Sequence, residues 1–217
     1  MDPAAKRLRH LIVVATLIIG AFGAGVYFAL GPAGGDSQAN IPGLLWPNPP
    51  HVDTFALTNV DGRPLDTAYL AGKWTLLFFG FTHCPDVCPT TLATLKHVRE
   101  LLIATGPFKS TLQVLFVSVD PERDSPAVLK SYVGYFDPSF NAAIGTEAEL
   151  KAVARELGII YAKIPTADPA LYNVDHTASV LLIGPAATLL GVFPPPHRAD
   201  QIAQRVREIE VFVASHS

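Results

Sequence analysis

The sequence predicts an α/β fold, with a mixed central sheet flanked by helices, and three observations support this prediction. Two continuous apolar runs, residues 74–81 and 112–119, are typical of strands that are covered on both faces of a sheet. Stretches with helical periodicity lie between the predicted strands, which is the arrangement expected of an α/β fold. The last three predicted elements are strand, strand and helix, so we expect a mixed sheet rather than a wholly parallel one.

The first half of the predicted domain contains a hairpin, a buried strand and a long helix. Residues 53–57 and the turn-forming sequence at 59–62 predict a short hairpin. The apolar run at residues 74–81 follows as the buried strand. A helix is expected from Pro89 to about residue 105, because proline is common at the first position of a helix.

The second half alternates between strands and helices. After the strand at 112–119, Ser125-Pro126 predicts the start of a helix that ends near Phe136, and residues 147–157 predict another helix. Two late strands are expected at 177–183 and 188–193. The closing helix, residues 199–213, is amphipathic, and its apolar face consists of Ile202, Val206, Ile209 and Val213.

A long apolar segment near the N-terminus predicts a membrane anchor. Charged residues make up 16% of the 217-residue chain, below the quarter or so that is usual for a soluble protein, and residues 11–30 contain none. About 20 apolar residues are enough for a helix to cross a bilayer. The alternative is a cleaved signal peptide, with Ser37-Gln38-Ala39 as the cleavage site, but its apolar region would be longer than is usual.

The charges beside this segment predict its orientation. Lys6, Arg7 and Arg9 precede it, and no basic residue follows it closely. The positive-inside rule then places the N-terminus in the cytoplasm and the rest of the chain outside. We therefore expect a single-pass protein of the bacterial inner membrane, with its globular domain in the periplasm.

The chain is expected to have four parts. These are a cytoplasmic basic flank (1–10), the transmembrane anchor (11–30), a Pro/Gly-rich linker (31–50) and a single globular domain (51–217). The net charge of −3 and the lack of a basic stripe argue against nucleic-acid binding. Two cysteines in the chain exclude a small fold held together by many disulfides.

Both cysteines lie between the first buried strand and the helix that follows it, at a C-x-x-x-C spacing. Each is followed by proline, which disfavours helical geometry in the preceding residue, so we expect a loop from Cys84 to Cys88 and a helix from Pro89. Cys88 would then lie at the cap of the helix, where the helix dipole favours a thiolate.

The cysteine pair alone permits three interpretations. A structural disulfide across so short a loop stabilises the fold little. A dithiol oxidoreductase is a second interpretation, although the usual C-x-x-C motif is one residue shorter. The third is a soft-metal site, for which C-x₂₋₄-C is a known ligand spacing.

A metal site needs a further ligand, and His176 is the strongest histidine candidate. It directly precedes a predicted buried strand, and in a thioredoxin-like sheet the loop at that position faces the cysteine loop. Asp175 beside it is a candidate to anchor the loop or to support the ligand from outside the coordination sphere. His83 adjoins Cys84, but strand alternation turns it away, so we interpret it as a structural loop residue.

Four sequence motifs together resemble the Sco/SenC family, whose members are membrane-anchored copper-binding proteins that assist cytochrome c oxidase assembly. The motifs are GKW at 72–74, FGFTHCPDVCP at 79–89, VSVDPERD at 117–124 and VDHT at 174–177. The resemblance covers about residues 45–215, and it implies a thioredoxin-like fold with copper bound by Cys84, Cys88 and His176. Thiolates suit Cu(I), and imidazole also accepts Cu(II), so the donor chemistry agrees with this implication.

The resemblance also implies a function and a set of partners. We expect a metallochaperone, rather than an enzyme, that delivers copper to the dinuclear copper site of an oxidase subunit. A redox-active disulfide between Cys84 and Cys88 would add thiol–disulfide exchange, and would need a thioredoxin-like reductant alongside an upstream copper donor. The alternative is a membrane-tethered reductase that prepares the oxidase cysteines for metal. We expect the segment Asp120-Pro121-Glu122-Arg123-Asp124 to cap a helix and anchor a loop, and we keep Asp120 as a candidate to support the metal ligands indirectly.

Overall fold

The computed structural model describes residues 16–18, 20–21, 41–104, 106–167 and 172–216. The chain divides into two compact units, Met1–Ala39 and Asn40–Ser217, and the second is the domain described below. The expected basic flank, most of the expected anchor at 11–30 and linker residues 31–40 lie outside the described residues. In the described part of the chain, no helix combines the length and the apolar character needed to cross a membrane.

Seven strands form one mixed sheet in the order β2-β1-β5-β4-β3-β8-β9. The central strands β3, β4 and β5 run parallel to one another, whereas β8, β9 and β1 pair antiparallel with their neighbours, so the predicted mixed sheet is confirmed. Its strands are β1 (Leu57–Asn59), β2 (Pro64–Leu65), β3 (Trp74–Gly80), β4 (Leu112–Ser118), β5 (Asn141–Ile144), β8 (Val180–Ile183) and β9 (Leu189–Phe193).

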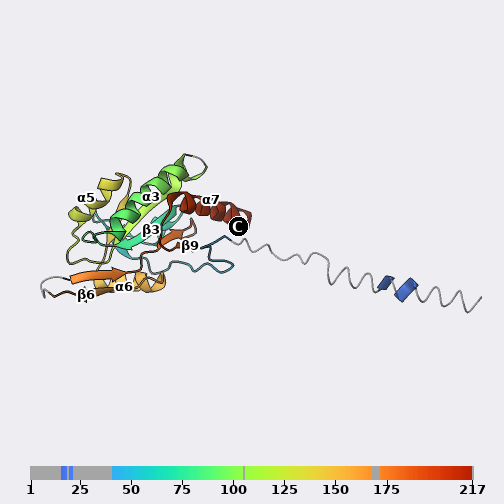
Figure 1. The fold of residues 1–217 in the computed structure, drawn as a ribbon, viewed down its shortest axis with the longest axis horizontal. Helices are drawn as coiled ribbons and strands as arrows, with labels where there is room; N and C mark the ends of the chain where they lie inside the picture. The colour runs from blue at the N-terminus through green and yellow to red at the C-terminus, as the bar shows by residue number, and fades with distance from the viewer. Residues whose placement is uncertain (1–15, 19, 22–40, 105, 168–171, 217) are drawn as a thin grey trace, which may run out of the picture. The chain divides into compact units, whose positions relative to one another are not determined.

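Helices cover both faces of this sheet. Helices α3, α5 and α7 lie along one face, and α6 lies on the other with a separate ribbon made by β6 and β7 (Figure 1). The helices are α2 (Thr67–Leu70), α3 (Val87–Ile103), α4 (Phe108–Thr111), α5 (Pro126–Phe136), α6 (Glu147–Glu156) and α7 (Ala199–His216). The ribbon consists of β6 (Tyr161–Pro165) and β7 (Tyr172–His176), which pair antiparallel.

The core lies between the sheet and these helices. Every residue of β3 is buried, as expected for a strand covered on both faces. The apolar face predicted for the closing helix is also confirmed, since Ile202, Val206 and Ile209 of α7 are buried. Helix α5 begins at the predicted place, where the Ser125 side chain accepts a hydrogen bond from the backbone N–H of Val128.

Several predicted boundaries are wrong. The hairpin is present, but its first strand begins at Leu57 rather than at residue 53, and the strand predicted from residue 177 begins at Val180. Strands β5, β6 and β7 are absent from the prediction because their sequences of four or five residues lack the long apolar runs that identify β3 and β4.

The last part of the predicted linker belongs structurally to the domain. The backbone N–H of Leu45 donates to the carbonyl of Leu190, and Leu44 forms a bridge with Gly191. Proline and glycine content predicts a linker here, but it does not exclude an extended segment that pairs with the edge of a sheet.

Candidate metal centre

The two cysteines lie where the central strand β3 leads into α3. The helix begins at Val87, two residues earlier than predicted, so Cys88 lies in the first helical turn rather than at the cap. Pro89 is tolerated there because the first backbone N–H groups of a helix have no intrahelical acceptor. One of these N–H groups, that of Cys88, donates to the sulfur of Cys84 at 3.4 Å.

The Cys88 sulfur packs directly against the backbone of β3 at Gly80. A Cβ atom at Gly80 would lie 2.8 Å from the Cys88 sulfur and 2.7 Å from the ring of Phe116 on β4. Any larger residue would therefore displace the sulfur, the ring or both. The glycine in this otherwise bulky strand leaves room for the thiol, which is fully buried.

A buried carboxylate fixes the start of the cysteine loop. Asp124 accepts hydrogen bonds from the backbone N–H of Thr82 at 3.1 Å, from the Thr82 hydroxyl and from the Ser118 hydroxyl at 2.6 Å. These donors compensate the buried charge and tie the loop to the end of β4. His83 is a half-exposed loop residue, with its Nδ1 3.1 Å from the Thr82 hydroxyl, as the sequence predicts.

His176 is the last residue of β7, so it lies on a strand rather than in the loop that the sequence predicts. Its ring meets Phe78 and Phe81 edge to face, with centroid distances of 6.0 and 5.9 Å. Its Nδ1 lies 3.1 Å from the carbonyl oxygen of Thr177 and donates to it. This hydrogen bond leaves Nε2 with a free lone pair, which is the arrangement that metal-binding histidines need.

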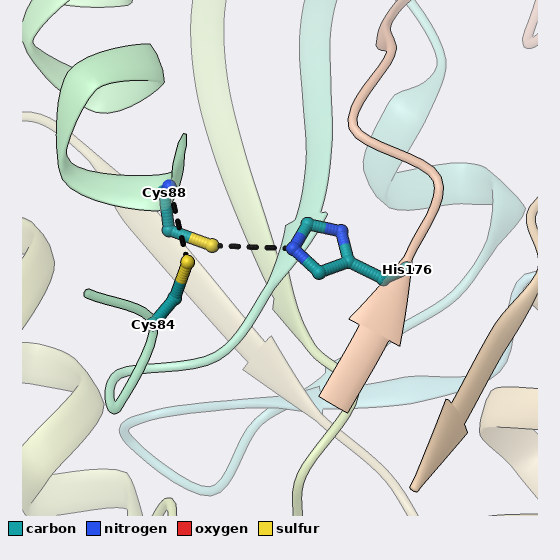
Figure 2. Close-up of side chains that lie close together, drawn as sticks. All are labelled: Cys84, Cys88 and His176. Carbon is teal, nitrogen blue, oxygen red and sulfur yellow. Dashed lines mark hydrogen bonds between the residues drawn. The ribbon is translucent and has the colours of Figure 1, made fainter. Parts of the chain in front are cut away.

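The three side chains converge from two separate parts of the fold. The ligand atoms of Cys84, Cys88 and His176 all lie within 4.8 Å of one another (Figure 2). The Cys88 sulfur is 3.4 Å from Nε2 of His176 and donates its thiol proton to that nitrogen. The three residues line or adjoin a cleft of about 270 Å³, whose rim carries Asp86 and Asp175. Two sulfurs and one imidazole nitrogen form a set of donors that suits a soft or borderline transition metal.

Burial favours uncharged groups at the centre of the site. It raises the pKa of the Cys88 thiol and lowers the pKa of the His176 imidazole, so the two groups favour a thiol and an uncharged ring. The prediction that the helix N-terminus favours a Cys88 thiolate is therefore wrong. Desolvation is the largest cause of the raised pKa at this sulfur, and the hydrogen bond from the helix N-terminus goes to Cys84 instead.

Asp120 and Asp175 have different environments. Asp120 is fully buried, and it accepts hydrogen bonds from Nε of Arg123 and, at 2.6 Å, from the hydroxyl of Tyr172 at the start of β7. It thus helps to hold the ribbon that carries His176. Asp175 is exposed on the cleft rim, and its charge counteracts part of the fall in the pKa of His176.

Sequence reasoning missed two residues that support the site. Thr177 supplies the carbonyl that orients the imidazole, and the Tyr172 hydroxyl fastens the start of β7 to Asp120. The loop anchoring predicted for the segment Asp120–Asp124 is present, since Asp124 holds the cysteine loop. The Thr177 contact depends on the local ring orientation and the Tyr172 contact on tertiary packing, and no sequence pattern indicates either.

Comparison with known proteins places the chain in a family. A sequence model of SCO1/SenC proteins matches residues 47–210. A Stutzerimonas stutzeri protein named as copper-binding is 34% identical over 169 residues, which cover 78% of this chain and 80% of that protein. The mitochondrial SCO1 homolog of Homo sapiens is 40% identical over 155 residues, which cover 70% of this chain and only 50% of the human protein.

A solved structure agrees with the fold and with the sequence match. The copper-bound structure of Bradyrhizobium japonicum ScoI aligns with a TM-score of 0.62 and 36% identity, over 70% of this chain and 96% of that one. The match extends across the domain that brings the two cysteines and the histidine together. The chain therefore belongs to the SCO1/SenC family.

Proposed function

We propose that this protein binds copper through Cys84, Cys88 and His176 and delivers it to the dinuclear copper site of a cytochrome c oxidase subunit. The observation that carries the proposal is the convergence of one nitrogen and two sulfur atoms within 4.8 Å at the base of an open cleft. The copper-bound state of the Bradyrhizobium relative and the description of the Sco family as cytochrome c oxidase assembly proteins support it.

Copper is the cargo of this site, and the two cysteines bind it differently from the histidine. Both thiols lose their protons when they bind the ion, and the thiolates then compensate its positive charge. The imidazole is already uncharged, so it binds through the lone pair of Nε2 without first losing a proton. Three protein ligands leave a further coordination position toward the cleft, through which a ligand of the receiving protein can approach.

We further propose that the protein works at the outer face of the bacterial inner membrane, held there by residues 11–30. The uninterrupted apolar length and the basic residues on one side only support this placement. In the oxidising periplasm a disulfide oxidant can take two electrons and two protons from the two thiols and become a dithiol, which leaves the Cys84–Cys88 disulfide and removes both thiolate ligands. A thioredoxin-like dithiol would reverse this reaction and become a disulfide itself, and a copper donor would then load the site.

A thiol–disulfide reductase is the second candidate function. It is favoured by the close approach of two free cysteines, one partly exposed and one buried, beside the N-terminus of a helix. Such an activity needs the two sulfurs and access to one of them, but it does not need an imidazole. His176 therefore separates the two candidates.

The deciding experiment replaces His176 with alanine in the full-length protein and measures copper binding and disulfide cycling side by side. If the protein is a chaperone, His176→Ala loses the Cu(II)–thiolate absorption and fails in oxidase assembly. It still binds Cu(I), more weakly, because Cu(I) tolerates two thiolates, and its cysteines still cycle.

His197→Gln is the matched control. His197 is also half-buried and also contacts Phe78, but its nitrogens pair with the Thr91 hydroxyl and the Phe193 carbonyl. Copper binding by this variant should equal that of the wild type. A His176→Ala protein that keeps its Cu(II) spectrum and supports full oxidase assembly would favour the reductase instead.

A further inference from the structure

Tyr132 on α5 carries a buried hydroxyl that none of the interactions described so far uses. Its oxygen is shielded from solvent and has no hydrogen-bond partner among the described residues. The ring is held firmly, with centroids 5.7 Å from Phe116 and 5.6 Å from Phe136. A buried polar group without a partner costs free energy, so its retention calls for an explanation.

This hydroxyl lies on the same side of the sheet as the cysteine pair. The Phe116 ring that packs against Tyr132 also borders the space beside Gly80, where a Cβ atom would meet both this ring and the Cys88 sulfur. The pKa of the Tyr132 phenol is raised first by burial, and then by the negative charges that Cys88, Cys84 and Asp124 can carry. The charge on either cysteine is thus felt at this hydroxyl.

The possible acceptors near Tyr132 differ in how far they are already satisfied. The Asp124 carboxylate accepts from both polar groups of Thr82 and from Ser118. The Cys88 thiol is itself a donor, to His176. Loss of the thiol protons on metal binding changes this, because a metal-bound thiolate has lone pairs that accept hydrogen bonds.

We propose that Tyr132 is a positioning residue that acts on copper through the cysteines, by donating a hydrogen bond from its hydroxyl to a thiolate of the Cys84–Cys88 pair when the site is loaded. The inference rests on the proposed copper function and assigns a role within it. A hydrogen bond to a thiolate sulfur withdraws electron density from the copper–sulfur bond. It therefore stabilises Cu(I) relative to Cu(II) and raises the midpoint potential of the bound ion.

The test compares Tyr132→Phe with Tyr161→Phe in the full-length protein. Tyr161 on β6 is the matched control, because its hydroxyl is also buried and also has no partner among the residues that the structure describes. The pKa of Tyr161 is raised to about 12 by burial and by Glu147, with no contribution from a cysteine. The two variants thus remove the same atom from two different environments.

We expect Tyr132→Phe to bind one copper ion per chain and to shift the balance between its oxidation states. The ratio of Cu(I) to Cu(II) affinity should fall about tenfold, which is about 59 mV in the midpoint potential of a one-electron couple. The Cu(II)–thiolate absorption should move to lower energy, because the sulfur becomes a stronger donor. Tyr161→Phe should match the wild type in both measurements.

Three outcomes would overturn the inference, and they differ in what else they overturn. If Tyr132→Phe has the potential and spectrum of the wild type, the hydroxyl is only an orphaned polar group and the copper function stands. If both variants shift equally, the effect is a general one of losing a buried hydroxyl. If the wild-type protein does not bind copper at all, the proposed function fails and the role of Tyr132 fails with it.

Discussion

The two halves of the candidate metal centre are supported in different ways. The cysteine half is part of the core, because Cys88 is fully buried against Gly80 of the central strand. The histidine half belongs to the β6–β7 ribbon, which the sheet pairing separates from the seven-stranded sheet in the described domain. Packing therefore sets the position of the Cys88 sulfur, whereas the position of the imidazole also depends on the polar contacts that hold the ribbon.

Those polar contacts lie at both ends of β7. At its start, Arg123 donates to the Tyr172 carbonyl at 3.0 Å, and the Tyr172 hydroxyl donates to Asp120 at 2.6 Å. At its end, the Thr177 backbone N–H donates to the Ile160 carbonyl at 2.8 Å, and the Ile160 N–H donates to the Thr177 hydroxyl at 3.0 Å. Changes in the cysteine half should thus lower both the stability of the fold and the affinity for copper. Changes in the ribbon should mainly weaken the part of copper binding that depends on His176.

The largest effect is expected from Gly80→Ala in the cysteine half. The added methyl group would lie 2.8 Å from the Cys88 sulfur and 2.7 Å from the Phe116 ring. Overpacking of this kind costs about 1–3 kcal/mol of folding free energy, and the displaced sulfur should weaken binding of both Cu(I) and Cu(II). Chemical denaturation and copper titration of the same sample would measure the two effects.

Gly134→Ala on α5 is the control for this change. A Cβ atom there meets no atom within 4 Å, and alanine should stabilise the helix by about 0.5–1 kcal/mol. If Gly80→Ala bound copper as well as Gly134→Ala, the sulfur would not be held by the backbone of β3.

A smaller and more selective effect is expected from Tyr172→Phe in the ribbon. This change removes the hydroxyl that donates to the buried Asp120 carboxylate, a contact worth about 1.5–3 kcal/mol. The loosened ribbon should weaken Cu(II) binding severalfold and Cu(I) binding little, because Cu(I) depends mainly on the two sulfurs. Tyr135→Phe, at a side chain that is 85% exposed, should change neither. Equal losses for Cu(I) and Cu(II) would mean that the ribbon also positions the cysteines.

The smallest effect is a pH dependence of stability that comes from His197. Burial lowers the pKa of this imidazole below its unfolded value of about 6.5, so the unfolded chain binds a proton more readily than the folded one. This contribution to stability is complete above about pH 6.5 and is lost as the pH falls below that value. Denaturant unfolding at about pH 7.5 and about pH 5.5 measures how much the free energy of unfolding falls in acid. This fall should be smaller for His197→Gln than for the wild type. If the free energy of unfolding fell equally in the variant and the wild type, His197 would not be the group that causes the pH dependence.

The cysteine half was more predictable from sequence than the histidine half, and the reason is the range of the interactions. The apolar run of β3, the following helix and the two cysteines are local features, and the structure contains all of them with small shifts in boundaries. The ribbon consists of two short, partly polar strands, and its histidine meets Cys88 across 88 residues of sequence. The contact between Gly80 and Cys88 depends on how α3 packs on the sheet, which no periodicity encodes.

The unequal exposure of the two sulfurs has a consequence for the order in which a bound metal ion changes its ligands. Cys88 is fully buried, whereas Cys84 and His176 are partly exposed and line the cleft. A ligand that enters from the cleft therefore replaces Cys84 or His176 before it can replace Cys88. In the delivery proposed above, the buried sulfur is then the last to dissociate, and the ion passes to its acceptor by stepwise exchange without being released into solvent.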